Sequence, residues 1–351
     1  MSESEQRGLG EFAAPGEDRP DEEAAVVAGD AGQTVSEVVD AADLKFPDSD
    51  GVVQMEVTQV DYTIEGSGAS EYPVIHVFGR TAENEDEHVR VLGVEPYFYV
   101  PTEDVEDRAL TEEYDVILDT RTEDQNGDQF ESIRGKPLTK VIGRTPRDVG
   151  QIRDDFEEHY EADILFPNRF LIDKDVSAGL QVPERRLEDG RIQVRYDDEQ
   201  LVAVEAPTEA QLRVNTFDIE VDDRSGFPED GEEPIVCLTS HDSYDDEYVV
   251  WLYDAPDAEG SPPEDLSEYE PIADSGSVDV RVFEEEAAML DAFVSYIEET
   301  NPDVLTGWNF EDFDMPYVLD RLEIVDHGSE YDLDIDRLSR VNEVWRSDWG
   351  G

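Results

Sequence analysis

The sequence predicts a mixed α/β protein, of the α+β kind, in which two folded domains follow an acidic tail. Its length of 351 residues is that of two domains. From about residue 51, apolar and polar residues alternate in short runs, as they do in sheet strands. Apolar residues spaced three and four apart between residues 283 and 299 predict an amphipathic helix. Together these observations predict domains built of both strands and helices.

Residues 1–50 form the predicted tail. They are rich in Glu, Asp, Ala and Gly and have no sustained apolar period. Such a segment buries too little apolar surface to offset the entropy of ordering, so we expect disorder, with a fleeting helix at most.

The first folded domain is predicted to span residues 51–210. Runs of β-prone residues between turn residues predict strands at 52–62, 72–78, 88–94, 116–118, 138–142, 164–173 and 191–206. Helices are expected at 102–114 and 146–160. An aromatic cluster at 95–101 lies between two prolines, and core packing is favoured there over a ligand pocket.

The second domain is predicted to span residues 211–351. Strands at 214–221, 234–240 and 248–253 form an antiparallel meander, which a surface loop at 255–277 follows. A helix at 283–299, a short buried strand at 304–307 and a helix at 315–324 come next, with Asp314 as the cap of the last helix. This β-β-β-α-β-α order, with a parallel fourth strand beside the first, fits a ribonuclease-H-like sheet.

Two carboxylates on the first predicted strand of this domain indicate a functional site. Alternate side chains of a strand share a face, so Asp218 and Glu220 lie together. A buried or half-buried pair of like charges requires protonation or a cation, and oxygen ligands suit Mg²⁺ or Mn²⁺. The alternative is a solvated strand face, because a chain with 92 acidic residues contains such triplets by chance. The apolar flank and a second acidic element at 307–314 favour a metal site.

The net charge of −66 would ordinarily argue against nucleic acid as a partner. Lysine occurs at only four positions and arginine supplies the other cations, a composition typical of salt-loving archaea. At about 1 M salt the Debye length is roughly 3 Å, which largely screens distant surface charge. The composition therefore predicts a molar-salt cytoplasm and leaves DNA possible.

The single cysteine, Cys237, excludes an internal disulfide framework and a cysteine zinc site, and a small core residue is the favoured interpretation. The sequence has no signal peptide and no apolar run long enough to span a membrane. We expect a cytoplasmic protein with no membrane partner.

The two acidic elements resemble two motifs of one family. The tetrapeptide Phe-Asp-Ile-Glu at 217–220 resembles the first exonuclease motif of family B DNA polymerases. Residues 307–318, Gly-Trp-Asn-Phe-Glu-Asp-Phe-Asp-Met-Pro-Tyr-Val, resemble the second and more specific motif. Residues 135–138 and 169–174 resemble the N-terminal domain of archaeal members. The resemblance covers about residues 52–349.

The resemblance implies a magnesium- or manganese-dependent 3′-5′ proofreading exonuclease that acts on the single-stranded 3′ end of DNA. It implies that Asp218 bridges two ions, that Glu220 holds the ion carrying the attacking water, and that Asp314 supports the second ion. Two ions of this kind activate the water and stabilise the leaving oxygen.

The resemblance also implies DNA contacts. Asn309 would orient the strand end, and Phe310 and Phe313 would stack on unpaired bases, although domain core is the alternative for both rings. Archaeal members read template uracil with their N-terminal domain, and Pro96 and Tyr97 would form part of that pocket, with core packing favoured. A primer-template, the remaining polymerase portion and, through it, a sliding clamp are the implied partners.

The chain departs from the family at the third exonuclease motif, Tyr-x-x-x-Asp. Tyr331 is followed by Asp334 and Asp336, which are at other spacings. Palm, fingers and thumb are missing. We therefore expect the front part of a polymerase, as a fragment or split product, with little or no exonuclease activity and no polymerase activity on its own.

Two other functions stay open from the sequence. The first is a non-catalytic DNA-binding or subunit-docking module, which would bind DNA without turnover. The second is an acidic interaction protein that mimics DNA, which rests on charge alone and does not explain the two motifs.

Overall fold

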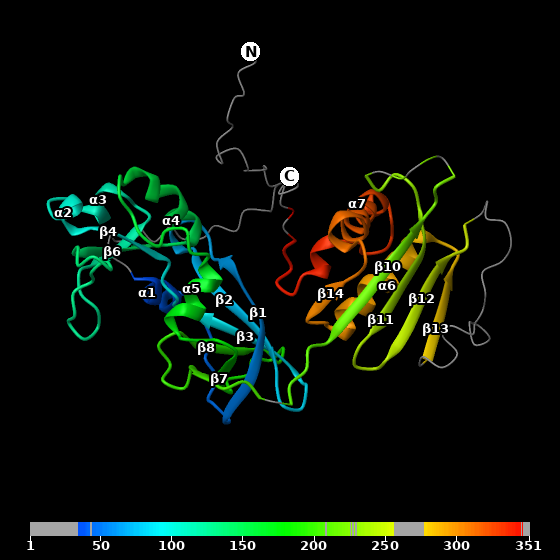
Figure 1. The fold of residues 1–351 in the computed structure, drawn as a ribbon, viewed down its shortest axis with the longest axis horizontal. Coiled ribbons are helices and arrows are strands. Elements are labelled where there is room, and N and C mark those ends of the chain that lie inside the picture. Colours follow the sequence, from blue (N-terminus) through cyan, green and yellow to red (C-terminus); the bar gives the residue numbers. More distant parts are fainter. Residues whose placement is uncertain are drawn as a thin grey trace, which may run out of the picture. The chain divides into compact units, whose positions relative to one another are not determined.

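A computed structural model describes residues 34–42, 44–207, 209–224, 226, 228, 230–255, 277–344 and 346. These residues form three sheets and the helices packed on them (Figure 1). The first sheet has the strand order β8-β3-β2-β1-β7-β9. Its strands are β1 (Val52–Glu65), β2 (Tyr72–Arg80), β3 (Asp86–Leu92), β7 (Gly179–Pro183), β8 (Ile192–Arg195) and β9 (Val202–Val204).

The first sheet is held by long antiparallel pairings of β1 with β2 and of β2 with β3. Every residue of β2 is buried, because this strand lies between neighbours inside the sheet and is covered on both faces. The helix α5 (Phe166–Asp173) packs Phe166 and Phe170 against the core of this sheet.

A smaller sheet has the order β4-β6-β5, with strands β4 (Tyr97–Pro101), β5 (Ile117–Arg121) and β6 (Leu138–Gly143). The short helices α2 (Thr102–Val105), α3 (Leu110–Glu113) and α4 (Pro146–Ile152) accompany it. Its core contains Phe98, Val141 and Phe156. The strands of the first domain that the sequence predicts before residue 143 are thus confirmed, whereas the helix expected at 102–114 is two single turns.

The predicted disordered tail does not extend to residue 50. Helix α1 (Val35–Ala41) begins with a capping box between Thr34 and Glu37. Its buried Val38 and Val39 pack beside Tyr72 and Val74 of β2. The sequence predicts a fleeting helix here at most, because the apolar contact that stabilises α1 is with a distant strand. Residues 1–33 lie outside the described residues.

Two further elements of the first domain differ from the sequence prediction. Residues 166–173, predicted as a strand, form the helix α5, because Phe166, Arg169 and Phe170 share its buried face. The helix predicted over 146–160 ends at Ile152 and a 3₁₀ turn follows, so that Tyr160 pairs with Tyr99 through two backbone hydrogen bonds.

The sheet of the second domain has the order β13-β12-β11-β10-β14. Its strands are β10 (Val214–Val221), β11 (Ile235–Asp242), β12 (Glu247–Tyr253), β13 (Ser277–Phe283) and β14 (Val304–Thr306). Antiparallel β10, β11 and β12 form the predicted meander, and β14 pairs in parallel with β10. The predicted ribonuclease-H-like sheet is confirmed, with one parallel strand more than expected, β13 beside β12.

The helices α6 (Glu286–Thr300) and α7 (Met315–Asp326) supply the core of this domain together with the apolar side chains of the sheet. Phe217, Trp251 and Phe293 meet there in edge-to-face contacts. Asp314 precedes α7 as predicted, but its side chain makes no capping hydrogen bond. That leaves its carboxylate for another role.

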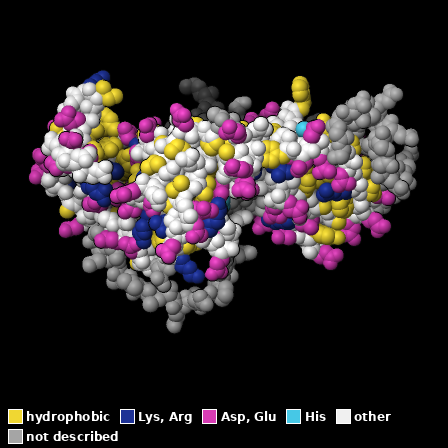
Figure 2. Space-filling view, turned by 90° about the horizontal axis from the view of Figure 1, so that it is seen from below, with side chains coloured by type: hydrophobic (Ala, Val, Ile, Leu, Met, Phe, Trp, Pro, Cys, Tyr) yellow, Lys and Arg dark blue, Asp and Glu magenta, His cyan; other side chains and the backbone are white. Residues whose placement is uncertain are grey.

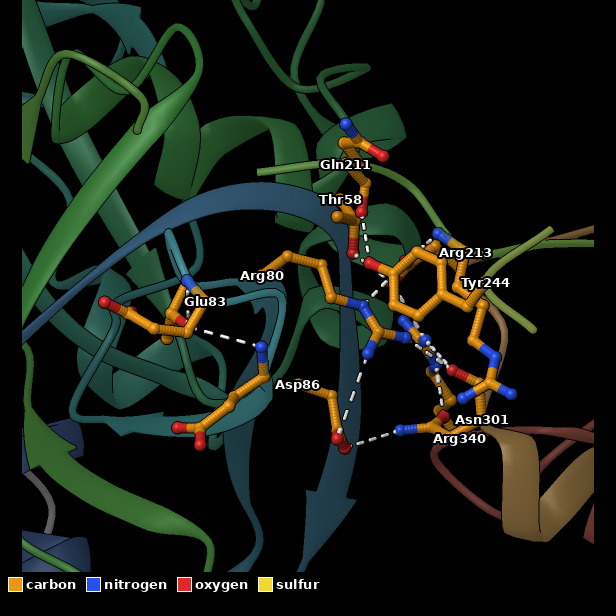
Figure 3. A network of polar contacts seen from close by, with 12 residues as sticks. Thr58, Arg80, Glu83, Asp86, Gln211, Arg213, Tyr244, Asn301 and Arg340 are labelled. Atoms are coloured by element: carbon orange, nitrogen blue, oxygen red, sulfur yellow. Dashed lines mark hydrogen bonds and ion pairs between the residues drawn. The ribbon is translucent and has the colours of Figure 1, made fainter. Parts of the chain in front are cut away.

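A buried carboxylate, Asp303, joins the first sheet to the sheet of the second domain. Figure 3 labels its partners Thr58, Arg80, Arg213 and Arg340. Arg80 of β2 and Arg340 donate to its two oxygens at 2.8 and 3.0 Å. Thr58 of β1 and the backbone N–H of Arg213 add hydrogen bonds at 3.2 and 2.8 Å. The side chains of Arg80 and Asp303 are 3% and 1% exposed. Because Asp303 directly precedes β14, this network also fixes where β14 begins.

Acidic side chains are spread over the whole of the face shown in Figure 2, with the cations scattered among them. This distribution agrees with the net charge of −66. Among the helices in the described part of the chain, none is both long and apolar enough to cross a membrane.

Candidate active site

Strand β10 presents Asp218 and Glu220 on one face, as its alternation predicts. Phe217 and Ile219 are buried in the domain core, whereas the two carboxylates are exposed. The pair is therefore solvated rather than buried, and its charge alone does not require a bound cation. The burial that the sequence argument assumed occurs at a different carboxylate, Asp314.

Strand β11 contributes neighbours to the same face. Thr239 lies opposite Asp218 and Cys237 lies opposite Glu220 in the antiparallel register. Cys237 is half-buried, so it is not the core residue expected from the sequence. Burial, and then the charges of Glu220 and Asp218, raise the pKa of its thiol to about 11. In the absence of an ion the thiol is thus protonated at neutral pH.

The turn after β14 brings Asp314 to this face. Gly307 passes so close to β10 that a Cβ atom there would lie 2.4 Å from the carbonyl oxygen of Phe217, so only glycine fits. A π-helical turn follows at Phe310–Asp314, in which the backbone N–H of Asp314 donates to the carbonyl of Asn309 at 3.1 Å. This wide turn points the Asp314 side chain inward.

Asp314 is 2% exposed, and its Oδ2 atom has no hydrogen-bond partner among the described residues. Burial, and then the charge of Asp218, raise the pKa of the Asp314 carboxyl. A buried carboxylate oxygen without a partner costs free energy, which an approaching cation would recover. Asp218 and Asp314 therefore fit two ligands of a divalent ion.

The described residues do not supply a complete metal cluster. No three His, Cys, Asp or Glu side chains converge closely enough, within the described ranges, to hold an ion. Glu220 lies two residues along β10 from Asp218, and the third ligand position is not formed. Two of the three predicted carboxylates are thus brought into electrostatic contact.

The aromatic residues of the second motif divide into two groups. Phe310 packs on Phe217 at 5.3 Å between ring centroids, and Phe313 lies 5.4 Å from Tyr317. Both rings pack against the domain core, the alternative that the sequence left open. Asn309 is exposed. Trp308 is 98% exposed, although sequence reasoning did not select it. The sequence feature that would have indicated Trp308 is its position directly before Asn309.

In the aromatic cluster of the first domain, Tyr97 is held by a hydrogen bond and by two cations that lie over its ring. The Tyr97 hydroxyl donates to Asp173 at 2.8 Å, and its ring lies 3.7 Å from the Lys140 ammonium and 4.3 Å from the Arg169 guanidinium. The backbone of Pro96 accepts a hydrogen bond from Gly143. Tyr97 is buried, yet it lines a cavity of about 240 Å³ together with Arg121 and Tyr196.

Comparison with known proteins gives consistent results. A DNA polymerase delta catalytic subunit from Oryza sativa is 26% identical over 332 residues, covering 78% of this chain and 28% of the relative. A DNA polymerase from Archaeoglobus fulgidus is 26% identical over 240 residues, covering 65% of this chain and 26% of the relative. The chain thus spans only about a quarter of the length of these curated relatives.

Among solved structures, the family B DNA polymerase from Pyrobaculum calidifontis superimposes with a TM-score of 0.57 at 25% identity. That match covers 81% of this chain and 34% of the other. Residues 157–348 match the family described as DNA polymerase family B, exonuclease domain. This match covers more than half of the 351 residues, so the chain belongs to the exonuclease-domain family of the family B DNA polymerases.

Proposed function

We propose that the chain forms the front part of a family B DNA polymerase and carries part of its 3′-5′ proofreading exonuclease. One observation carries this proposal more than any other. Asp314 is buried, and one of its carboxylate oxygens has no hydrogen-bond partner among the described residues. Burial, and then the charge of Asp218, raise the pKa of its carboxyl. Such an arrangement is costly for stability alone and is useful where a divalent cation binds.

In the proposed site, Asp218 and Asp314 are the two carboxylates that hold a magnesium or manganese ion, and Glu220 is the third. A pair of such ions supplies an activated water and stabilises the leaving 3′ oxygen. Asn309 orients the end of the strand. Trp308, because of its exposure beside Asn309, offers a base-stacking surface that the core-packed Phe310 and Phe313 offer less readily.

The extent of the protein is part of the proposal. The coverage of only 28% of the first relative supports a longer polymerase, in which further residues complete the metal site. We propose residues 51–210 as its N-terminal domain and residues 211–351 as the incomplete exonuclease domain. The scarcity of lysine and the charge of −66 support a haloarchaeal, cytoplasmic setting. A primer-template is the proposed partner, with a sliding clamp reached through the rest of the polymerase.

Metal titration tests the candidate site directly. Electron paramagnetic resonance measures the affinity of the chain for Mn²⁺. We expect this affinity to fall at least tenfold in Asp218→Asn and in Asp314→Asn, since each removes one charged ligand. Asp104→Asn, an exposed aspartate on α2, is the matched control and should bind as the unchanged chain does. Equal Mn²⁺ binding in all four proteins would refute the site.

Hydrolysis of a labelled single strand tests the activity. We expect little or no 3′-5′ degradation by these residues alone, because no complete ligand set lies within the described ranges. Clear degradation that Asp218→Ala abolishes would contradict the predicted inactivity and confirm the exonuclease. Metal-independent DNA binding without turnover would instead favour the second candidate, a DNA-binding module.

The cavity beside Tyr97 supports a second, smaller proposal, that Pro96 and Tyr97 belong to a template-base pocket. The Tyr97 and Tyr196 rings in the cavity lining offer stacking surfaces for a base, whereas its cations Arg121, Lys140 and Arg195 are already paired with carboxylates. Oligonucleotides with and without uracil, compared for binding to the chain and to Tyr97→Ala, test it. Identical affinities of both proteins for both oligonucleotides would contradict the proposed template-base pocket.

A further inference from the structure

A second ring-lined depression lies in the first domain, away from the candidate active site. It is a groove of about 630 Å³ between β4 and the loop of residues 122–137. Three half-buried aromatic rings, Tyr99, Phe130 and Tyr160, line it together with Leu138 and the fully exposed Ile133. Hydrophobic side chains gather at the left end of Figure 2, the end where Figure 1 places β4 and β6.

The backbone holds these rings in place. Tyr99 and Tyr160 are joined by reciprocal backbone hydrogen bonds of 3.0 and 2.8 Å. The carbonyl of Phe130 accepts a hydrogen bond of 2.8 Å from Leu138, which keeps the loop against β6. The Phe130 ring lies 5.3 Å from the Tyr99 ring at an interplanar angle of 61°. The rings are therefore fixed before any ligand arrives, which lowers the entropic cost of binding.

One cation at this groove lacks the pairing that nearly all others have. Among the described lysines and arginines, those without a carboxylate within 4.0 Å are Arg134, Arg144 and Lys174. Arg144 donates to a backbone carbonyl and Lys174 lies on the Tyr196 ring. Arg134 lines the groove and is exposed.

The carboxylates of the groove are mostly committed to other partners. Glu158 accepts from Lys136 and from the Tyr160 hydroxyl, and Glu161 accepts from Arg169. Glu131 lies exposed on the rim. In a chain with 92 acidic residues, a cation beside three rings that forms no ion pair in the described structure marks a place for an anion from outside.

We propose that this groove binds single-stranded nucleic acid, with unpaired bases against Phe130 and its neighbouring tyrosines and one phosphate on Arg134. Nucleic acid supplies both features at once, a flat π face for the rings and a negative charge for the guanidinium. An apolar peptide would fill the groove but would leave Arg134 without an anion. The groove shares no residue with the Asp218 and Asp314 site.

Fluorescence anisotropy with a short labelled oligothymidylate tests the proposal, in EDTA so that the candidate metal site does not contribute. Phe130→Ala should weaken binding roughly tenfold, the loss of one base-aromatic stack. Phe130→Tyr should retain binding, whereas Phe130→Leu, which keeps apolar volume without a ring, should lose it. Circular dichroism of each variant checks that it is folded.

Salt dependence tests the phosphate contact separately. One neutralised phosphate predicts a slope of about −0.7 in a plot of log affinity against log salt for a single strand. Arg134→Glu should abolish that slope. Arg191→Glu makes the same charge change at a half-buried arginine of the same domain that pairs with Asp189 and does not line the groove, and should leave the slope unchanged.

Three outcomes would overturn the proposal. The first is equal affinity of Phe130→Ala and the unchanged chain. The second is equal binding of a duplex of the same sequence, because paired bases cannot stack on the rings. The third is a groove variant that leaves oligonucleotide binding intact but abolishes self-association in sedimentation experiments, which would make the groove a protein interface. None of these depends on metal binding or hydrolysis at the candidate active site.

Discussion

Asp303 and Asp314 are two aspartates with buried side chains, one directly before β14 and the other directly before α7, and their surroundings are opposite. Asp303 accepts bonds from Arg80, Arg340 and Thr58. Asp314 has an oxygen with no partner among the described residues. Burial alone would raise the pKa of both carboxyls, but the arginine contacts hold the pKa of Asp303 below its usual value, whereas that of Asp314 is raised. A paired buried charge fixes structure, and an unpaired one is available for a ligand.

The largest expected effect comes from breaking the paired site. Asp303→Ala leaves two buried guanidinium groups without their carboxylate, which should lower the free energy of unfolding by about 3–5 kcal/mol. Chemical denaturation measures it. Asp86→Ala is the matched control, since Asp86 is exposed at the rim of the same network and should cost under about 1 kcal/mol. Equal losses in the two variants would mean that burial does not decide the strength of this network.

The next effect concerns the unpaired site. Saturating Mn²⁺, at about a hundred times its dissociation constant, should stabilise the unchanged chain by about 2.7 kcal/mol. Asp314→Asn should lose most of this gain because it removes the buried negative charge, whereas Asp86→Ala should keep it. Thermal unfolding with Mn²⁺ and with EDTA provides the comparison. An unchanged gain in Asp314→Asn would show that the ion binds elsewhere.

Without metal, the two aspartates should respond to neutralisation with opposite signs. In EDTA, Asp314→Asn should raise the free energy of unfolding by about 1 kcal/mol, because it removes a buried charge whose Oδ2 atom has no hydrogen-bond partner among the described residues. Asp303→Asn should lower it. Urea unfolding of both variants at neutral pH decides the matter, and destabilisation by both would contradict the inference that Asp314 is held at a cost.

The smallest effect is a difference in pH dependence. The lowered pKa of Asp303 gives a stability that is present above the unfolded value of about 3.9 and is lost as pH falls through the folded pKa. The raised pKa of Asp314 gives a stability that is present below about 3.9 and is lost as pH rises through the folded pKa. Denaturation across this range at constant salt, in EDTA, should show each loss reduced in the matching Asn variant. Parallel curves for both variants would show that the two shifts do not differ in sign.

The sequence predicted correctly those elements whose structure depends on residues close together in the chain. The alternation of β10 and the parallel pairing of β14 followed from residue spacing and order, and both are confirmed. Helix α5 was predicted as a strand, because the contacts that fix its helical face lie on the first sheet, far away in sequence. For the same reason the sequence predicted α1 as a fleeting helix at most and did not indicate the Asp303 network, since each depends on partners more than 30 residues distant.

The site was predictable as a set of residue types but not as an environment. The sequence indicated that Asp218, Glu220 and Asp314 belong together, yet it assigned burial to the strand pair. Burial of Asp314 arises from the close passage of Gly307 under β10 and from the turn that follows. Neither is visible in residue spacing. The role of the three carboxylates stays a prediction until metal binding is measured.

The π-helical turn at Phe310–Asp314 sets the direction in which side chains point at the start of α7 relative to β14. Its ring of hydrogen bonding closes from Asp314 back to Asn309, one residue wider than an α-helical turn. Each residue of a regular helix advances the side chain by about 100° around the axis. A chain without one of the two phenylalanines between Asn309 and Asp314 would therefore keep the same acidic residues and the same helix, but would turn that carboxylate away from Asp218. The length of this turn, as much as the identity of its residues, sets which way the acid points.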